Sequence, residues 1–398
     1  MSIRDRMNPS FARVGKIDFP AFLELVEGGR TLMGWADPFY PDPCLPDGVI
    51  EATKRALDTG KTHYTLPIGL RELRRVVARK VGAYNHLTAD PDLNVIITPG
   101  SDIGLYFAML VLIAPGDEVL NPDPSYQSNA KNTQLMGAIS VPVPLHSSRG
   151  FQLDIEEFEK RVTNRTKLIV LTQPNNPTST VYRREQLEKL AEFAIAHDLF
   201  VVADHAFEST IFDGREFVTI ASLPGMWERT ISVFSTSKGM GMSGFRVGYN
   251  VACDEIMSVM HSTAVNVLGA TNTFAQYGAI AAFEDDAFVE DFNRIYERRR
   301  RDAFDILNAI PGATCLLPES GFMIWLNIAA LGSSKEVAHF LTEDARIIVN
   351  PGSSYGQFGE GYLRIMLGSL REEGAFQDAM ARIAASLRKL SAANKLNT

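Results

Sequence analysis

The chain has 398 residues, of which 45% are hydrophobic and 22% are charged, and its formal net charge is −8. This composition is typical of an ordinary globular protein, and the length is sufficient for one large α/β domain and a smaller one. The negative charge argues against a nucleic-acid partner, because phosphate backbones are bound by basic surfaces.

The three cysteines, Cys44, Cys253 and Cys315, lie far apart and lack the spacing of a disulfide framework or a metal site. The N-terminal residues MSIRDRMNPS contain no apolar core of signal-peptide length, and no apolar run is long enough to cross a membrane. We therefore expect a cytoplasmic protein without a membrane partner and without a metal.

The stretch from about residue 46 to 285 alternates between helical and strand-like patterns, which predicts an α/β domain. Continuous apolar runs favour strands that are buried on both faces of a mainly parallel sheet. Strands are predicted at 94–98, 118–121, 167–172, 200–203, 231–234 and 247–251, and helices at 69–85, 100–115 and 184–197.

The pattern changes after about residue 285. A long charged helix is predicted at 287–309, strands at 322–326 and 361–366, a helix at 335–343 and a final helix from about residue 372. We expect a smaller α+β domain over 286–398, and an N-terminal segment, 1–45, that packs with this domain and with the active site.

Polar residues follow four of the predicted strands directly. Ligands of an open α/β sheet bind at the carboxyl ends of its strands. The helix that starts after the first strand offers free backbone N–H groups and a positive dipole end to an anion. The candidate residues at this edge are Gly100, Ser101, Asp102, Asn176, Asp204, Lys238 and Arg246.

Lys238, set among glycines and serines, is the candidate nucleophile. A lysine in a cleft can lose its proton and form a Schiff base with an aldehyde. Pyridoxal 5′-phosphate is the aldehyde that makes this useful, because it acts as an electron sink for a carbanion. Asp204 would keep the pyridine nitrogen of this cofactor protonated, and Asn176 would donate its amide to the ring oxygen.

The phosphate of this cofactor needs a cation and hydroxyl groups. Arg246, Ser235 and Ser237 would supply them beside the helix start at Gly100. Tyr126, in the segment DPSYQS, is the candidate for stacking on the ring.

The order and spacing of these residues resemble those of the class I/II aminotransferases, which are fold-type I pyridoxal-phosphate enzymes, over about residues 30–385. The segments that carry the resemblance are TPGSDIG, QPNNPTS, ADHAFE and STSKGMGMSGFRVG. The resemblance implies an α/β fold with a large cofactor domain, 46–285, containing a mainly parallel, seven-stranded type of sheet between helices. It also implies a homodimer with active sites at the subunit interface.

Two further segments assign roles through the same resemblance. YTLPIGLRELR implies that Tyr64 reaches the phosphate in the neighbouring subunit, and GYLRI implies that Arg364 binds the α-carboxylate of the substrate. Asn176 and the N-terminal residues Trp35 and Ala36 are expected to contact the substrate as well.

The chain departs from the family pattern at four positions. Phe207, a position in contact with the cofactor, replaces a common tyrosine whose hydroxyl stabilises the ring oxygen, so we expect a higher Schiff-base pKa. His205 stands where a glutamate is frequent, and Ser179 replaces a glycine. Ala36 occupies a position usually held by glycine, and Trp35 beside it is expected to line the side-chain pocket.

The leading hypothesis is an aminotransferase that transfers the amino group of an α-amino acid to a 2-oxo acid, with Lys238 as the general acid and base. The departures leave open a lyase that eliminates a β- or γ-substituent, or an oxidative deaminase on the same scaffold. A pyridoxal-phosphate-binding transcriptional regulator would need a DNA-binding module, and no basic helix-turn-helix pattern precedes the large domain.

Overall fold

The computed structural model of the chain describes residues 3–12 and 19–396. Residues 1–2 and 13–18 of the predicted N-terminal segment, and residues 397–398 of the predicted C-terminal domain, lie outside the described residues.

A seven-stranded sheet in the order β2-β8-β7-β6-β5-β3-β4 forms the larger part of the described chain. The strands from β7 to β4 are parallel, and β8 is antiparallel to both of its neighbours. This order confirms the mainly parallel sheet that the apolar runs predict. The strands are β2 (Val95–Thr98), β3 (Glu118–Asp123), β4 (Ile139–Pro144), β5 (Thr166–Thr172), β6 (Phe200–Asp204), β7 (Thr230–Ser235) and β8 (Gly248–Val251).

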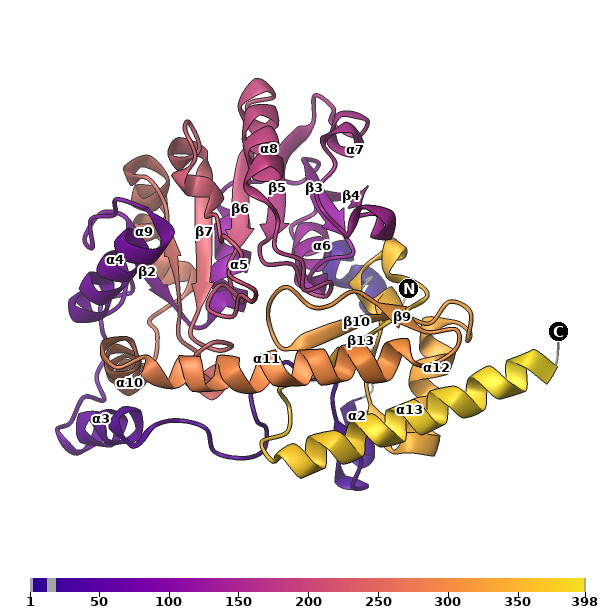
Figure 1. Cartoon of the computed structure of the whole chain (residues 1–398). Coiled ribbons are helices and arrows are strands. Elements are labelled where there is room, and N and C mark those ends of the chain that lie inside the picture. The colour runs from indigo at the N-terminus through magenta and orange to yellow at the C-terminus, as the bar shows by residue number, and fades with distance from the viewer. Residues whose placement is uncertain (1–2, 13–18, 397–398) are drawn as a thin grey trace.

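Helices cover both faces of this sheet, and β5 shows why its residues are apolar throughout. Leu168 and Val170 pack in one core with α5 and α9, whereas Ile169 and Leu171 pack in another with α8 on the opposite face (Figure 1). Side chains alternate along a strand, so a strand between two helical layers needs apolar residues at every position. The helices of this part are α3 (Asp47–Asp58), α4 (Arg71–Asn85), α5 (Ser101–Leu110), α6 (Gln127–Leu135), α7 (Ile155–Glu159), α8 (Arg184–Ala196), α9 (Asp254–Val267) and α10 (Thr273–Glu284).

In this region one predicted boundary was wrong and one strand, β4, was missed. Helix α5 ends at Leu110, before the predicted end at Pro115. Strand β4 was not predicted, because it lies at the sheet edge, contains Pro142 and Pro144 and is only partly buried. Proline is tolerated at an edge, where one side of the strand has no hydrogen-bonding partner.

A smaller antiparallel sheet has the order β12-β13-β10-β9. Its strands are β9 (Thr314–Cys315), β10 (Met323–Asn327), β12 (Asn350–Pro351) and β13 (Tyr362–Met366), and its helices are α11 (Ala287–Asn308), α12 (Ser334–Phe340) and α13 (Glu373–Leu396). The predicted helix at 335–343 divides into α12 and a π-helical turn, Leu341–Ala345. Figure 1 shows α11 passing beneath the larger sheet to reach the smaller one.

The N-terminal segment joins the smaller sheet region through β1 (Thr31–Leu32), which pairs in parallel with β11 (Ile347–Ile348). Helices α1 (Pro9–Ala12) and α2 (Phe19–Glu27) precede it. The side chain of Met33 is buried in the core that α11 and α13 form over the smaller sheet. The domain boundaries at 45 and 285 stay a prediction.

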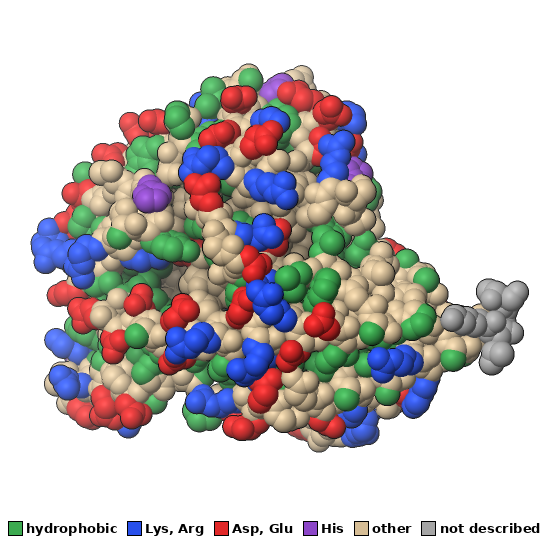
Figure 2. Space-filling view, viewed as in Figure 1, with side chains coloured by type: hydrophobic (Ala, Val, Ile, Leu, Met, Phe, Trp, Pro, Cys, Tyr) green, Lys and Arg blue, Asp and Glu red, His purple; other side chains and the backbone are tan. Residues whose placement is uncertain are grey.

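The surface mixes both charges. Figure 2 shows Lys and Arg side chains interspersed with Asp and Glu over the face in view, without a broad area of one sign. Among the described residues, no helix combines the length and the hydropathy that crossing a membrane requires.

Candidate active site

A cavity of about 770 Å³ lies where the carboxyl ends of the larger sheet's parallel strands meet the N-terminal segment and the smaller sheet. The structure brings most of the residues singled out in the sequence to its wall. Those that line it are Trp35, Ala36, Ser101, Asp102, Tyr126, Asn176, Asp204, Phe207, Ser237, Lys238, Arg246 and Arg364.

Three of the predicted residues do not line the cavity. Gly100 lies behind it with φ +85°, and a Cβ at this position would collide with the guanidinium of Arg246. The hydroxyl of Ser235 accepts a hydrogen bond from the backbone N–H of Ser237 at 3.1 Å. Tyr64 is 97% exposed on the surface of the single chain.

The amino group of Lys238 lies inside the cavity and donates a hydrogen bond to the backbone oxygen of Ala36 at 2.5 Å. Removal from water lowers the pKa of Lys238, although the carboxylates of Asp102 and Asp37 oppose this shift. An amine with a lowered pKa is the form of lysine that attacks carbonyl carbons.

Asp204 ends β6 and is 5% exposed. One carboxylate oxygen accepts a hydrogen bond from the backbone N–H of Ala206 at 3.0 Å, and no described residue forms an ion pair with it. Burial raises the pKa of Asp204 to about 7. A buried carboxyl group without a cationic partner fits a protonated ring nitrogen, which would restore its usual charge.

Arg364, on β13, is 6% exposed and points into the cavity. Its Nη1 donates to the side-chain oxygen of Asn176 at 3.0 Å, and its Nη2 donates to the backbone oxygen of Gly34 at 2.7 Å and to Asn350 at 3.2 Å. Its guanidinium lies 4.9 Å from the ring centre of Tyr355. Its Nε is buried and has no hydrogen-bond partner among the described residues, which leaves a donor for an anion.

The start of α5 provides a second anion site. Arg246 lies over it, with Nη2 at 3.7 Å from a carboxylate oxygen of Asp102 and Nη1 donating to the backbone oxygen of Ser243 at 2.8 Å. The phenol of Tyr126 donates to Asp102 at 2.7 Å. The free N–H groups of a helix start together with an arginine suit a phosphate, so the residues present fit pyridoxal phosphate.

Several cavity residues were not identified from the sequence, among them the polar residues Asp37, Ser243, Asn350 and Tyr355. Ser243 donates its hydroxyl to the carboxylate of Asp37, which joins the N-terminal segment to the lysine motif. The segment GWADP and the lysine motif contain the first two, whereas Asn350 and Tyr355 carry no motif signal of their own.

The departures from the family pattern have structural counterparts. Phe207 is buried against Phe322, with 5.6 Å between ring centres, and brings no hydroxyl to the cavity. His205 is fully buried, and its Nδ1 lies 2.9 Å from the backbone oxygen of Gln173. Burial lowers the pKa of His205, so its ring is neutral at physiological pH.

Comparisons with known proteins identify the family to which the chain belongs. The model of the family "Aminotransferase class I and II" matches residues 30–383. The aromatic-amino-acid aminotransferase 2 of Thermococcus litoralis is 36% identical over 392 residues, covering 96% of this chain and 97% of that protein. An aspartate aminotransferase of Pyrococcus abyssi is 36% identical over 353 residues, covering 88% and 90%. The solved structure of an aromatic aminotransferase from Pyrococcus horikoshii OT3 has a TM-score of 0.86 at 34% identity, covering 92% and 99%.

The fold and the cavity thus define a pyridoxal-phosphate-dependent enzyme of fold type I. The chain belongs to the class I and II aminotransferase family. It is an aminotransferase that acts on α-amino acids, and pyridoxal phosphate is its cofactor.

Proposed function

We propose that the cavity described above is the active site of this aminotransferase and that Lys238 carries the cofactor. The proposal rests on one observation. One cavity is lined by Lys238, Asp204, Asn176 and Arg364, which come from separate segments of the chain. When bound, the cofactor supplies an electron sink: it accepts the electron pair that stays on the α-carbon of the substrate when the α-hydrogen leaves as a proton.

The remaining roles in binding and proton transfer belong to residues of this chain. Asp204 holds a proton on the cofactor ring nitrogen, and Asn176 donates its side-chain amide to the ring oxygen. Arg246, Ser237 and the start of α5 bind the phosphate, while Tyr126 covers the ring. Because burial lowers the pKa of Lys238, its Nζ can accept the α-proton of the substrate and return it.

Arg364 binds the α-carboxylate of the substrate and thereby points the α-hydrogen toward Lys238. Its Nη1 and Nη2 already donate to oxygen atoms of Asn176, Gly34 and Asn350, and a carboxylate can replace the latter two with charge-assisted hydrogen bonds. Trp35 and Ala36, which follow Gly34 in the chain, line the same cavity, and the backbone oxygen of Trp35 accepts from Ser369 at 3.3 Å.

The charges in the cavity support a preference for uncharged substrates. Its cations are Lys238, Arg246 and Arg364, which the proposal assigns to the cofactor aldehyde, the phosphate and the α-carboxylate. No cation among the residues lining the described cavity is left for a second carboxylate. Leu32, Trp35 and Ile348 offer apolar contacts instead. We therefore expect kcat/KM for L-phenylalanine to exceed that for L-aspartate.

The exposed surface supports a homodimer in which Tyr64 contributes to the site of the other subunit. Tyr64 is 97% exposed, and large apolar side chains nearby in the chain or on α5 and α9 are exposed as well: Leu66, Ile103, Leu110, Val259 and Val265. A subunit interface that included Tyr64 would cover apolar side chains of this kind. The three unpaired cysteines support a cytoplasmic, reducing location.

The visible spectrum of the purified protein tests the reaction. L-phenylalanine or L-aspartate is added without a 2-oxo acid, and ammonia is assayed in parallel. Bleaching in one turnover without ammonia, reversed by a 2-oxo acid, is the expected result. Persistent colour with accumulating ammonia would instead establish a lyase or an oxidative deaminase. Lys238→Ala should abolish the response, and an unchanged response would refute the assignment of Lys238.

A further inference from the structure

Ser179 lies in the loop after β5, three positions beyond Asn176, where the family pattern has a glycine. It is 1% exposed and its φ is +60°. Side chains other than those of glycine, asparagine and aspartate rarely adopt this conformation, because the Cβ crowds the backbone. A serine here is therefore strained, and the hydroxyl is the one polar group that it adds to a glycine.

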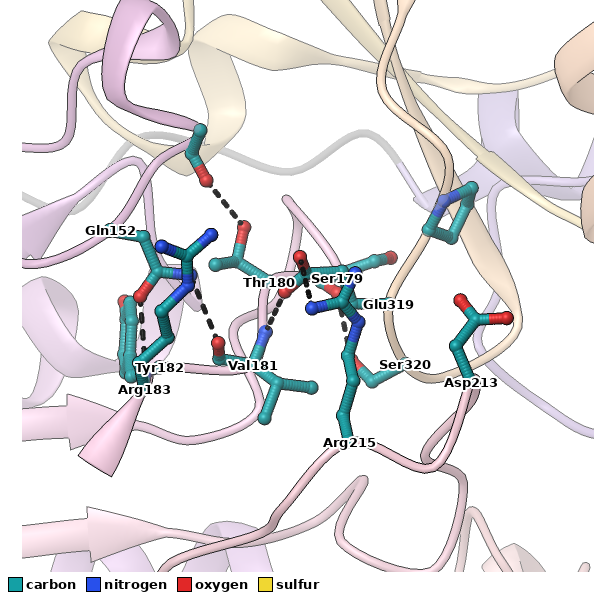
Figure 3. Close-up of polar contacts among 12 residues, drawn as sticks. Gln152, Ser179, Thr180, Val181, Tyr182, Arg183, Asp213, Arg215, Glu319 and Ser320 are labelled. Atoms are coloured by element: carbon teal, nitrogen blue, oxygen red, sulfur yellow. Dashed lines mark hydrogen bonds and ion pairs between the residues drawn. The ribbon is translucent and has the colours of Figure 1, made fainter. Parts of the chain in front are cut away.

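That hydroxyl joins the loop to the smaller sheet. It donates to the backbone oxygen of Met323, the first residue of β10, at 2.9 Å. The backbone oxygen of Ser179 in turn accepts from the backbone N–H of Glu319 at 3.1 Å and from the hydroxyl of Ser320 at 3.0 Å. Figure 3 shows the segment from Ser179 to Val181 held against Glu319 and Ser320.

Glu319 strengthens the same junction from the other side. Its carboxylate accepts from the backbone N–H of Val181 at 2.9 Å and lies 3.2 Å from a guanidinium nitrogen of Arg215 (Figure 3). The loop is thus fixed at both ends of a short turn, and within the described part of the chain only the Ser179 hydroxyl forms a hydrogen bond from this loop to β10.

Strand β10 lies next to the proposed substrate site, because it pairs with β13 and its Trp325 is opposite Arg364. The loop after β5 contacts the same site through Asn176, whose side-chain oxygen accepts a hydrogen bond from Arg364 Nη1 at 3.0 Å. Among the described residues, two hydrogen bonds therefore join the loop after β5 to the smaller sheet. The Asn176–Arg364 bond lies inside the cavity and the Ser179–Met323 bond lies outside it.

We propose that Ser179 is a positioning residue, whose hydrogen bond to Met323 sets the separation of Asn176 and Arg364 and so the affinity for the substrate carboxylate. The proposal rests on the proposed function, since it takes Arg364 as the carboxylate-binding residue. A merely structural serine would affect stability, whereas a positioning serine affects carboxylate binding even where stability is maintained.

Two substitutions separate these roles. Ser179→Gly removes the hydroxyl and also relieves the strained φ, so its unfolding midpoint should not fall below that of the parent. Ser179→Ala removes the hydroxyl and keeps the strain. Thr133→Val is the matched control, because it deletes a buried hydroxyl that donates only within α6, to Asn129 at 2.8 Å.

The first readout is the dissociation constant of 3-phenylpropionate, an unreactive carboxylate, measured by calorimetry on the cofactor-loaded protein. The loss of one hydrogen bond predicts an increase of about fivefold in both Ser179 variants. The KM for L-phenylalanine should rise by a similar factor with kcat changed less than about twofold. Thr133→Val should keep the parental values.

A dissociation constant in Ser179→Gly and Ser179→Ala within about twofold of the parent would overturn the proposal. An increase of the dissociation constant that appears only in the less stable of the two Ser179 variants would overturn it as well. If the parent transfers no amino group but binds 3-phenylpropionate, and the Ser179 variants bind it more weakly, the proposed reaction fails while the positioning role stands.

Discussion

Arg364 donates a hydrogen bond to the side-chain oxygen of Asn176 at 3.0 Å, although the two residues lie 188 positions apart. One comes from the loop after β5 of the larger sheet and the other from β13 of the smaller sheet. The contact joins the predicted cofactor edge to the predicted carboxylate-binding group. If Arg364 binds the α-carboxylate as proposed, the relative placement of the two sheets decides how a substrate is held.

Arg364→Lys should raise the KM for L-phenylalanine by about 10- to 100-fold, because a lysine cannot form the two parallel hydrogen bonds of a guanidinium. Steady-state kinetics measures this. Arg301→Lys, on the exposed face of α11, is the control and should leave KM unchanged. A parental KM in Arg364→Lys would show that the α-carboxylate binds elsewhere.

Gly100→Ala should weaken binding of pyridoxal phosphate by about tenfold or more, because the added Cβ would displace the Arg246 guanidinium. Gly116→Ala is a matched control: its φ is similarly positive, +93°, but no atom lies within 4 Å of the added Cβ. Both variants should lose stability through φ, and only the first should lose cofactor affinity. Equal affinities in a spectrophotometric titration would contradict the phosphate site.

Asp204 should give the cofactor-free protein a specific pH dependence. Burial raises its pKa from 3.8 to about 7, so the folded state retains a proton that the unfolded chain releases. Its contribution to the free energy of unfolding is therefore largest below about pH 4, falls as the pH rises to about 7 and stays low above that.

Asp204→Asn removes this dependence. The free energy of unfolding of the variant minus that of the parent should increase by on the order of 2 kcal/mol from about pH 5 to about pH 8. Urea unfolding of the cofactor-free proteins measures this difference. The same difference between the two proteins at both pH values would mean that Asp204 is ionised in the folded state throughout.

Phe207→Tyr should lower the pKa reported by the cofactor's visible absorbance by about half a unit or more, because the new hydroxyl can donate to the ring oxygen and stabilise its charge. Phe288→Tyr, on α11 and against Phe292 rather than the cavity, is the control. A pH titration in which Phe207→Tyr and the parent coincide would refute the explanation.

Tyr64→Phe should raise the dissociation constant of pyridoxal phosphate by several-fold, because in the proposed homodimer it removes one hydroxyl from the phosphate of the neighbouring subunit. Light scattering of the parent should give twice the mass of one chain. A monomeric parent with a fully bound cofactor would exclude the shared site.

Much of the fold and the site was predictable because it follows local rules. The apolar runs of β5 and β6 and the helix start at Ser101 place Asn176, Asp204 and the phosphate site at one edge of the sheet. The reversal of β8 was not predictable, since its apolar residues look the same in either direction. Asn350 and Tyr355 escaped prediction because their importance arises from contacts with Arg364 that only the tertiary structure creates.

The parallel pairing of β1 with β11 also determines the order in which the site can be completed during synthesis. Thr31 and Leu32 are synthesised before the larger sheet, but their partners Ile347 and Ile348, and Arg364 after them, are synthesised after it. Nascent chains can therefore form the larger sheet and its phosphate site first. Recognition of a carboxylate through Arg364 has to wait until β13 has left the ribosome as well.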